Sequence, residues 1–345
     1  MNRNPLGTYP RGAGLLFSLC IDGFVKYKTA EGLSQRTVDS YEWILHQWLD
    51  RMGDKPVGTI SSADVLDYMA FLRTDYIPHT FAKPKFQDEP TTHNRLSPKT
   101  LRNHWVTFKS FFSWAVIEFK IKNPMEGIPG PRYKEAPVAA FTKEDLAAML
   151  KACTYSREFN PINRQKFVTR RPSAKRDEAM ILFLLDTGLR ASELCCLKIG
   201  DVDMRTGKVI IKHGDEGGAK GGKGRTVFIG KSTRRVLWRY LIEREDRDDP
   251  EAPVFINRGY HPFNSNSLRH LIVRLAEKAG VKDAHPHKFR HTFAITYLRS
   301  GGDVFTLQAL LGHSSLDMVR HYAQIAEMDI ERVHRKASPV DNLRF

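Results

Sequence analysis

Apolar residues recur at intervals of three and four positions in three N-terminal segments of the chain, a pattern that predicts helices with one buried face. These helices are expected to begin at Ser34, Ser61 and Ser97, because a serine side chain can cap the free N–H groups of a first turn. Pro98 directly follows the third serine and suits the first helical position. The positions expected to face the core are Val38, Tyr41, Leu45, Trp48, Met52, Val65, Leu66, Met69, Leu72, Leu101, Trp105, Phe108, Phe112 and Ala115.

Two polar stretches interrupt the helical pattern. Residues 76–96 contain prolines and are expected to form a loop between helices. Residues 128–137 have the sequence IPGPRYKEAP, and this mixture of proline, glycine and charge is typical of a linker between domains. We therefore predict a helical domain over residues 1–130 and a second domain over residues 137–345.

The second domain combines helical and strand patterns, so the predicted fold class is mainly α with a small β-sheet (α+β). Thr142, with Asp145 three residues later, is typical of a helix start, and Gly188 ends an apolar helical run. Helical patterns cover residues 180–185, 268–279, 289–298 and 305–311. Strands are expected over residues 208–212, 226–229 and 254–256, and a turn rich in glycine and lysine joins the first two.

Composition narrows the possible partners. The 345 residues carry a net charge of +15, which favours a polyanion such as nucleic acid or an anionic membrane surface; residues 1–135 carry +4 and the rest +11. No run of about 18 apolar residues and no secretory leader pattern is present, which argues against a membrane protein. The four cysteines have neither zinc-ligand nor disulfide-scaffold spacing. We therefore expect a cytoplasmic protein that binds nucleic acid and no membrane.

Four segments of the second domain hold side chains suited to breaking a phosphodiester without a metal ion, which requires fixed cations, a proton donor and an in-line nucleophile. Arg190, in TGLRASEL, follows a helix end and can point into a cleft. Lys220 lies in a glycine-rich turn, KGGKGR, that lets a lysine reach DNA. His287 and Arg290, in HKFRHTFA, are three residues apart on one helix and can contact the same phosphate. Tyr322 lies near the end of a predicted helix in LGHSSLDMVRHY.

In this order the four motifs resemble those of the tyrosine recombinases, also called the phage-integrase family. The resemblance rests on TGLRxSEL, the hairpin KGxK, HxxRHTFA, and LGHSS with a tyrosine nine residues after its histidine. It covers the whole C-terminal part of the chain. The helical N-terminal part resembles, more loosely, the family's core-binding domain.

The resemblance implies a role for each matching residue and requires no cofactor and no metal. Arg190 and Arg290 would clamp the scissile phosphate, because two guanidinium groups suit the charge of a pentacoordinate transition state. His287 and His313 would hydrogen-bond the same phosphate and assist proton transfer. The hairpin lysine would protonate the leaving 5′ oxygen, with Lys220 as first choice and Lys223 as the alternative. Tyr322 would form a 3′-phosphotyrosine, whose bond energy allows resealing without ATP.

Other polar residues are assigned on simpler grounds. Lys223 and Arg225 follow the hairpin turn and are predicted to contact DNA phosphates. Lys99 and Arg102 open the third N-terminal helix and are also predicted to contact DNA, with a solvated charged face as the alternative. Glu193 is expected to orient a neighbouring side chain.

Partners and biological role follow from the family resemblance. We expect double-stranded DNA with specific core sites, and a homo-tetramer in the synapse linked through residues 327–335. The loop at residues 76–96 and the lack of an additional arm-binding domain favour integration, excision or transposition of a mobile element. Alternatives are Xer-type resolution of chromosome or plasmid dimers, a type IB topoisomerase-like enzyme, and a DNA-binding regulator without catalysis. Accessory proteins are not defined by the sequence.

Overall fold

The computed structural model describes residues 14–78, 95–133, 139–155, 169–212, 224–312, 338 and 340–341. The chain divides into two compact units, Met1–Ala136 and Pro137–Phe345, each of which has its own hydrophobic core. Among the described residues, no helix is both long and apolar enough to cross a bilayer.

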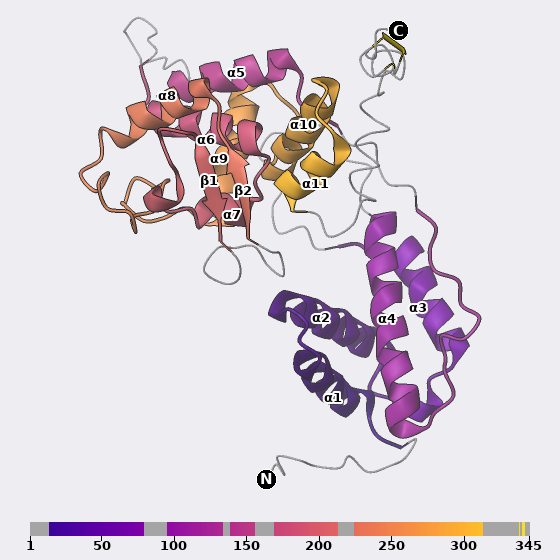
Figure 1. The fold of residues 1–345 in the computed structure, drawn as a ribbon. Helices are drawn as coiled ribbons and strands as arrows, with labels where there is room; N and C mark the ends of the chain where they lie inside the picture. Colours follow the sequence, from indigo (N-terminus) through magenta and orange to yellow (C-terminus); the bar gives the residue numbers. More distant parts are fainter. Residues whose placement is uncertain are drawn as a thin grey trace, which may run out of the picture. The chain divides into compact units, whose positions relative to one another are not determined.

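The described part of the first unit is helical. Its helices are α1 (Phe17–Ala30), α2 (Gln35–Met52), α3 (Ser62–Thr74) and α4 (Pro98–Phe119), with a short 3-10 turn, η1 (Val57–Thr59). The three predicted starts are confirmed, because Ser34, Ser61 and Ser97 each accept a hydrogen bond from a backbone N–H of the first turn. Helix α4 packs against the other three (Figure 1).

Aromatic rings fill the core of the first unit. Trp48 of α2 lies 4.9 Å from Tyr68 of α3 and 5.1 Å from Phe108 of α4, measured between ring centroids. Tyr68 takes the buried position expected for Leu66, which is 51% exposed. The prediction for Leu66 was wrong because it lies about 100° around the helix from Val65, outside the buried stripe of α3 that packs against α2 and α4.

The buried side chain of His104 makes the stability of the first unit depend on pH. Its side chain is 1% exposed, and its Nδ1 has no hydrogen-bond partner in the described part of the chain. Burial lowers the pKa of His104 from 6.5 to about 4, so the folded unit favours the neutral imidazole. The contribution of the neutral His104 side chain to stability is therefore complete above 6.5, its pKa in the unfolded chain, and is lost as the pH falls from 6.5 toward the folded pKa of about 4.

We expect the free energy of unfolding of the first unit to fall by about 2 kcal/mol between pH 6.5 and about 5, because the unfolded chain binds the proton first. Urea titrations followed by tryptophan fluorescence can measure this effect, since four of the five tryptophans lie in the first unit. His104→Phe should flatten the pH dependence. An equally steep dependence in that variant would contradict the assignment to His104.

The second unit is mainly helical with a two-stranded antiparallel sheet, which confirms the predicted fold class. Its elements are α5 (Lys143–Thr154), α6 (Ala174–Thr187), α7 (Ala191–Cys195), η2 (Ile199–Asp201), β1 (Lys208–Ile211), β2 (Arg225–Phe228), α8 (Lys231–Leu241), α9 (Ser265–Ala279), α10 (Pro286–Arg299) and α11 (Val304–Leu311). The register pairs Lys208 with Phe228 and Ile211 with Arg225. Helix α6 contacts α5, α8 and α10, so it lies at the centre of the unit (Figure 1).

The third strand predicted at residues 254–256 is not formed. Only isolated bridges occur there, Lys198 with Pro253 and Ile256 with Pro262. Proline has no N–H to extend a ladder, and the carbonyls of residues 253 and 254 both accept from the Nη1 atom of Arg244. The side chain of Arg244 therefore takes acceptors that a neighbouring strand would need.

Candidate active site

The TGLR segment forms a tight turn that presents Arg190. Thr187 ends α6 and donates its hydroxyl to the carbonyl of Phe183 at 2.6 Å. Gly188 then adopts a left-handed conformation with φ +62°, and a Cβ there would lie 2.5 Å from Cδ1 of Phe293. Leu189 is buried. The next residue, Arg190, is the N-cap of α7, and its side chain is 40% exposed. Only glycine satisfies both the φ angle and the space at position 188.

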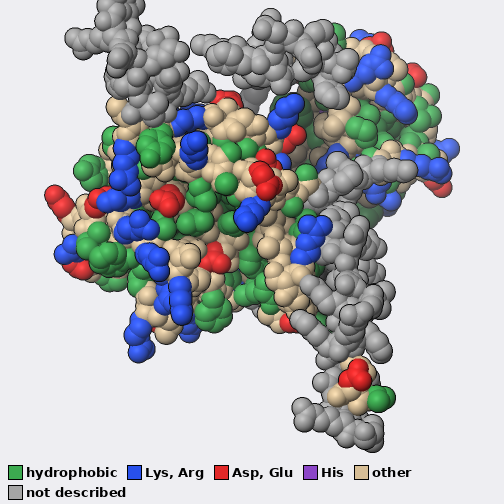
Figure 2. All heavy atoms as spheres, turned by 90° about the horizontal axis from the view of Figure 1, so that it is seen from above, with side chains coloured by type: hydrophobic (Ala, Val, Ile, Leu, Met, Phe, Trp, Pro, Cys, Tyr) green, Lys and Arg blue, Asp and Glu red, His purple; other side chains and the backbone are tan. Residues whose placement is uncertain are grey.

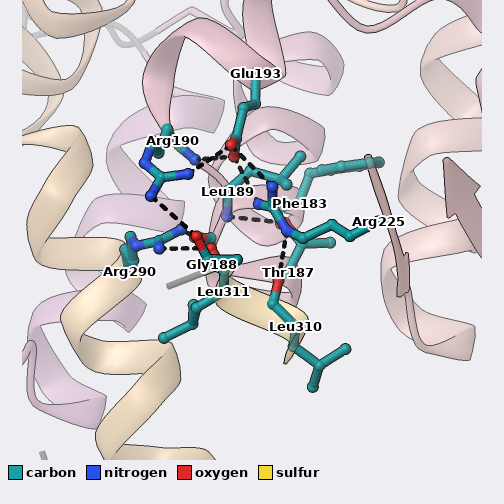
Figure 3. Close-up of polar contacts among 11 residues, drawn as sticks. Phe183, Thr187, Gly188, Leu189, Arg190, Glu193, Arg225, Arg290, Leu310 and Leu311 are labelled. Atoms are coloured by element: carbon teal, nitrogen blue, oxygen red, sulfur yellow. Dashed lines mark hydrogen bonds and ion pairs between the residues drawn. The ribbon is translucent and has the colours of Figure 1, made fainter. Parts of the chain in front are cut away.

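Glu193 of α7 is the acidic centre of the site (Figure 3). Its side chain is 0% exposed and accepts from the backbone N–H of Arg190 at 2.8 Å and from Nη1 of Arg190 at 2.9 Å. Arg225 donates to the same carboxylate from Nη1 at 2.9 Å and Nη2 at 2.7 Å. Burial alone would raise the pKa of Glu193, but the hydrogen bonds and charge of Arg225, together with the hydrogen bonds of Arg190, outweigh it and lower the pKa to about 2.

Helix α10 carries two predicted site residues with contrasting environments. Arg290 is 1% exposed and donates to the carbonyls of Gly188 at 2.9 Å and Leu311 at 2.7 Å. His287, one turn earlier, is exposed, and its ring centroid lies 4.4 Å from that of His291 in a T-shaped contact. Phosphate contact by His287 and Arg290 stays a prediction; the imidazole is open to solvent, whereas the guanidinium is held by carbonyls.

Three arginines meet at the C-terminal end of α11. The carbonyls of residues 310, 311 and 312 accept from Arg225 Nε at 2.7 Å, Arg290 Nη2 at 2.7 Å and Arg190 Nη2 at 3.5 Å, respectively. The last carbonyls of a helix lack partners within the helix and carry partial negative charge, so cations stabilise them. Arg190 and Arg290, which lie 100 residues apart in the sequence, are therefore brought together immediately before His313.

Residues 140–328 match the model of the phage integrase family. The chain belongs to that family. Curated relatives are named tyrosine recombinases, so the chain is an enzyme of this class, as the motifs predicted. XerA of Thermococcus kodakarensis is 26% identical over 323 residues, covering 94% of this chain and 96% of the relative. XerC of Staphylococcus epidermidis is 27% identical over 316 residues, covering 90% and 94%.

A solved structure shares the fold. The Tn1549 transposon integrase in complex with a circular intermediate DNA matches with a TM-score of 0.66 and 18% identity, over 93% of this recombinase and all of that chain. The recombinase is thus similar in fold to an integrase of a transposon and in sequence to Xer proteins.

Several predicted site residues of the recombinase lie outside the described residues: Lys220, Lys223, His313 and Tyr322, and also the segment 327–335. Lys99 and Arg102 belong to the first unit, where both are exposed. Arg102 donates to the carbonyl of Pro131 at 3.4 Å and lies 5.7 Å from the ring of Tyr133. DNA contact by Lys99 and Arg102 stays a prediction.

Arg225 occupies an environment that the sequence did not indicate. Its side chain is 8% exposed and its guanidinium is used by Glu193 and the carbonyl of Leu310, an arrangement suited to positioning rather than to surface contact with phosphate. One available signal was Glu193, because a buried carboxylate needs cationic partners and the two carboxylate oxygens can accept from more than one arginine. Among the described residues, no three His, Cys, Asp or Glu side chains are grouped to hold a metal ion.

Proposed function

We propose that this tyrosine recombinase is site-specific and cleaves and rejoins DNA through a 3′-phosphotyrosine at Tyr322. The observation that carries the proposal is the convergence of Arg190 and Arg290 on the adjacent carbonyls of residues 312 and 311, directly before His313. This arrangement fixes two cations close to the start of the segment that carries the candidate nucleophile. Such fixed charges stabilise a phosphoryl transition state without reorganisation during the reaction.

The proposed reaction balances without a cofactor. The phenol of Tyr322 gives its proton to His287 or His313 and its oxygen attacks the phosphorus. The bond to the 5′ oxygen breaks, and Lys220 or Lys223 supplies the proton to that leaving oxygen. The exposed imidazole of His287 would hydrogen-bond a nonbridging oxygen, as would His313. A 5′-hydroxyl of another strand then attacks the phosphotyrosine, and Tyr322 leaves, so the number of phosphodiesters is conserved.

Phosphate contact by Arg290 requires a rearrangement of the DNA-free geometry. Both terminal nitrogens donate to carbonyls and the side chain is buried, so one nitrogen must exchange its carbonyl for a phosphate oxygen. Arg190 requires no comparable change, because 40% of its side chain is exposed. We infer that Arg190 engages the phosphate first and that Arg290 follows as the turn after α11 adjusts.

DNA as the partner is supported by charge and by the shared fold. Lys and Arg side chains outnumber Asp and Glu on the face seen in Figure 2, in keeping with the net charge of +15. The Tn1549 integrase that shares the fold was solved with DNA. We further propose that four protomers form the synapse, linked through residues 327–335.

The proposed role is integration, excision or transposition of a mobile element. Xer-type resolution of chromosome or plasmid dimers is the second candidate, favoured by the match to XerA over 94% of this chain. The two roles differ in where the DNA sites lie. Mobile-element sites lie at the ends of an inserted segment, whereas a resolution site occurs once in each replicon.

Adduct capture tests the proposal and identifies the DNA site in the same experiment. Short genomic fragments from the source organism are lightly nicked, so that the small 5′-hydroxyl piece released by cleavage diffuses away and traps the covalent complex. After denaturing washes, the protein-bound DNA is sequenced. Wild type should retain a defined set of fragments and Tyr322→Phe none.

The alternatives give different results in the same experiment. A regulator without catalysis retains no DNA after denaturation. A topoisomerase-like enzyme retains fragments without a common sequence and relaxes supercoiled plasmid lacking a site. Either result would contradict the proposed function, and the positions of the captured sites would separate the mobile-element role from the resolution role.

A further inference from the structure

Arg225 connects three separate parts of the second unit through one guanidinium. It belongs to β2, donates to both carboxylate oxygens of Glu193 in α7, and donates Nε to the carbonyl of Leu310 in α11. These three segments are far apart in the sequence, and Figure 3 shows Arg225 directed between them. Three of its nitrogen atoms are therefore used within the protein.

The carboxylate of Glu193 is shared between Arg225 and Arg190. Arg190 uses one oxygen through Nη1 and the other through its backbone N–H, and Arg225 contacts both oxygens. Two cations on one buried carboxylate restrict each other, because movement of the carboxylate toward one weakens its bonds to the other. The orientation of Arg190 therefore depends on Arg225 through the carboxylate that they share.

Arg225 also contacts the turn that follows α11. Gly312 adopts φ +65°, and a Cβ on it would lie 3.2 Å from Cδ and Nη1 of Arg225. The arginine thus packs against the glycine that directs the chain toward His313, while its Nε holds the preceding carbonyl of Leu310 at 2.7 Å. Removal of Arg225 would free one of the three carbonyls and open space beside the turn.

The position of Arg225 in β2 also links it to the segment that carries the candidate lysines. Arg225 is the first residue of β2 and pairs with Ile211, the last residue of β1. Lys223 precedes it by two residues in the sequence, so Arg225 is anchored directly beside the C-terminal end of the lysine hairpin segment. An anchor at Arg225 therefore restricts where both candidate lysines can reach.

We propose that Arg225 is a positioning residue of the recombinase rather than a DNA contact. It holds Arg190, the base of the lysine hairpin and the turn that leads to the nucleophile segment in one fixed arrangement. The expected effect of Arg225 on DNA cleavage rests on the proposed function. Its structural part, the coupling of the turn after α11 to β2 and α7, can be measured without DNA.

A positioning role and a phosphate-contact role for Arg225 predict opposite effects of its substitution on DNA affinity and on cleavage rate. Loss of a phosphate contact weakens DNA binding and lowers the salt dependence of the affinity by about one released ion. Loss of a positioning residue leaves binding and its salt dependence intact and slows the chemical step, because small misplacements of catalytic groups are costly.

The test compares Arg225→Lys and Arg225→Gln with Arg244→Lys. Arg244 is a matched control, since it is also buried and also joins a carboxylate, Asp246, to backbone carbonyls of the same unit. The probe is a nicked duplex of a sequence captured by wild type. We expect the saturated rate of adduct formation to fall at least about tenfold in Arg225→Lys and about a hundredfold in Arg225→Gln, with dissociation constants within about twofold of wild type.

Hydrogen exchange of the DNA-free full-length chain gives the independent measurement. In both Arg225 variants the peptide covering residues 304–312 should exchange faster than in wild type, whereas peptides from α8 should be unchanged. Arg244→Lys should leave the exchange of residues 304–312 as in wild type.

Three results would overturn the proposal. One is a weaker affinity and smaller salt dependence with an unchanged saturated rate, which is the signature of a phosphate contact. Another is an equal loss of rate in Arg244→Lys, which indicates general destabilisation. The third is unchanged exchange at residues 304–312. If wild type forms no adduct, the proposed function fails, and the exchange measurement still decides whether Arg225 holds the turn.

Discussion

Replacing Arg190 with alanine is expected to lower the single-turnover rate of adduct formation by about a thousandfold, because a preorganised cation is lost from the transition state. The fold should remain, since Glu193 keeps both bonds from Arg225 and stays paired. The exposed guanidinium of Arg190 makes only a 3.5 Å contact with the turn after α11. Rapid-quench measurements on a nicked duplex from the capture experiment give the rate.

Two variants control this result. Arg190→Lys keeps the positive charge but loses the planar fork that can hold Glu193 and a phosphate together, so it should remain strongly impaired. Arg235→Ala removes an exposed arginine of α8 and should cleave like wild type. An Arg190→Ala protein that cleaves within about tenfold of wild type would contradict the role given to this residue.

Replacing Glu193 with glutamine should reduce the free energy of unfolding of the second unit by about 3 to 5 kcal/mol, because the buried guanidinium of Arg225 loses its counter-charge. Adduct formation should also slow, since Arg190 loses the carboxylate that orients it. Chemical denaturation at neutral pH followed by far-ultraviolet circular dichroism measures the first effect. Glu251→Gln is the matched control; Glu251 pairs with Lys198 on the surface, and its loss should leave stability unchanged.

The pH dependence of stability gives a second test of Glu193. Its folded pKa of about 2 lies below the ordinary value of 4.5, so the ionised carboxylate stabilises the fold at any pH above 4.5. That contribution is lost as the pH falls from 4.5 toward 2. Glu193→Gln should therefore show a shallower loss of stability in this window than wild type, and an identical acid-unfolding curve would refute the assignment.

Local signals predicted much of the fold. Ser34, Ser61 and Ser97 cap helices as expected, and the TGLR segment ends a helix at Gly188. Helix α1 was not predicted, although its buried residues Phe17, Cys20, Ile21 and Phe24 have helical spacing. Leu16 offers no side-chain cap at its start, and the exposed apolar side chains of Leu19 and Tyr27 obscure the buried stripe. Helix α8 was also missed, since Gly230 offers no side-chain cap and basic residues crowd its first turns.

The candidate site was only partly predictable, because its decisive contacts are non-local. The order of the motifs alone identified Arg190, His287 and Arg290 as candidates. The environment of Arg225 depends on Glu193, 32 residues earlier, and on Leu310, 85 residues later, so no window of sequence around the hairpin contains it. The burial of Arg290 likewise depends on the carbonyls of Gly188 and Leu311, which only the packing of α6, α10 and α11 brings together.

Direct mapping of the covalent bond tests the central claim. The wild-type adduct is digested with nuclease and trypsin, and the peptide HYAQIAEMDIER, which contains Tyr322, is sequenced by mass spectrometry. The account predicts that this peptide carries a nucleoside 3′-phosphate on the tyrosine oxygen. A nucleotide attached to any other residue, or an adduct that persists in Tyr322→Phe, would contradict it.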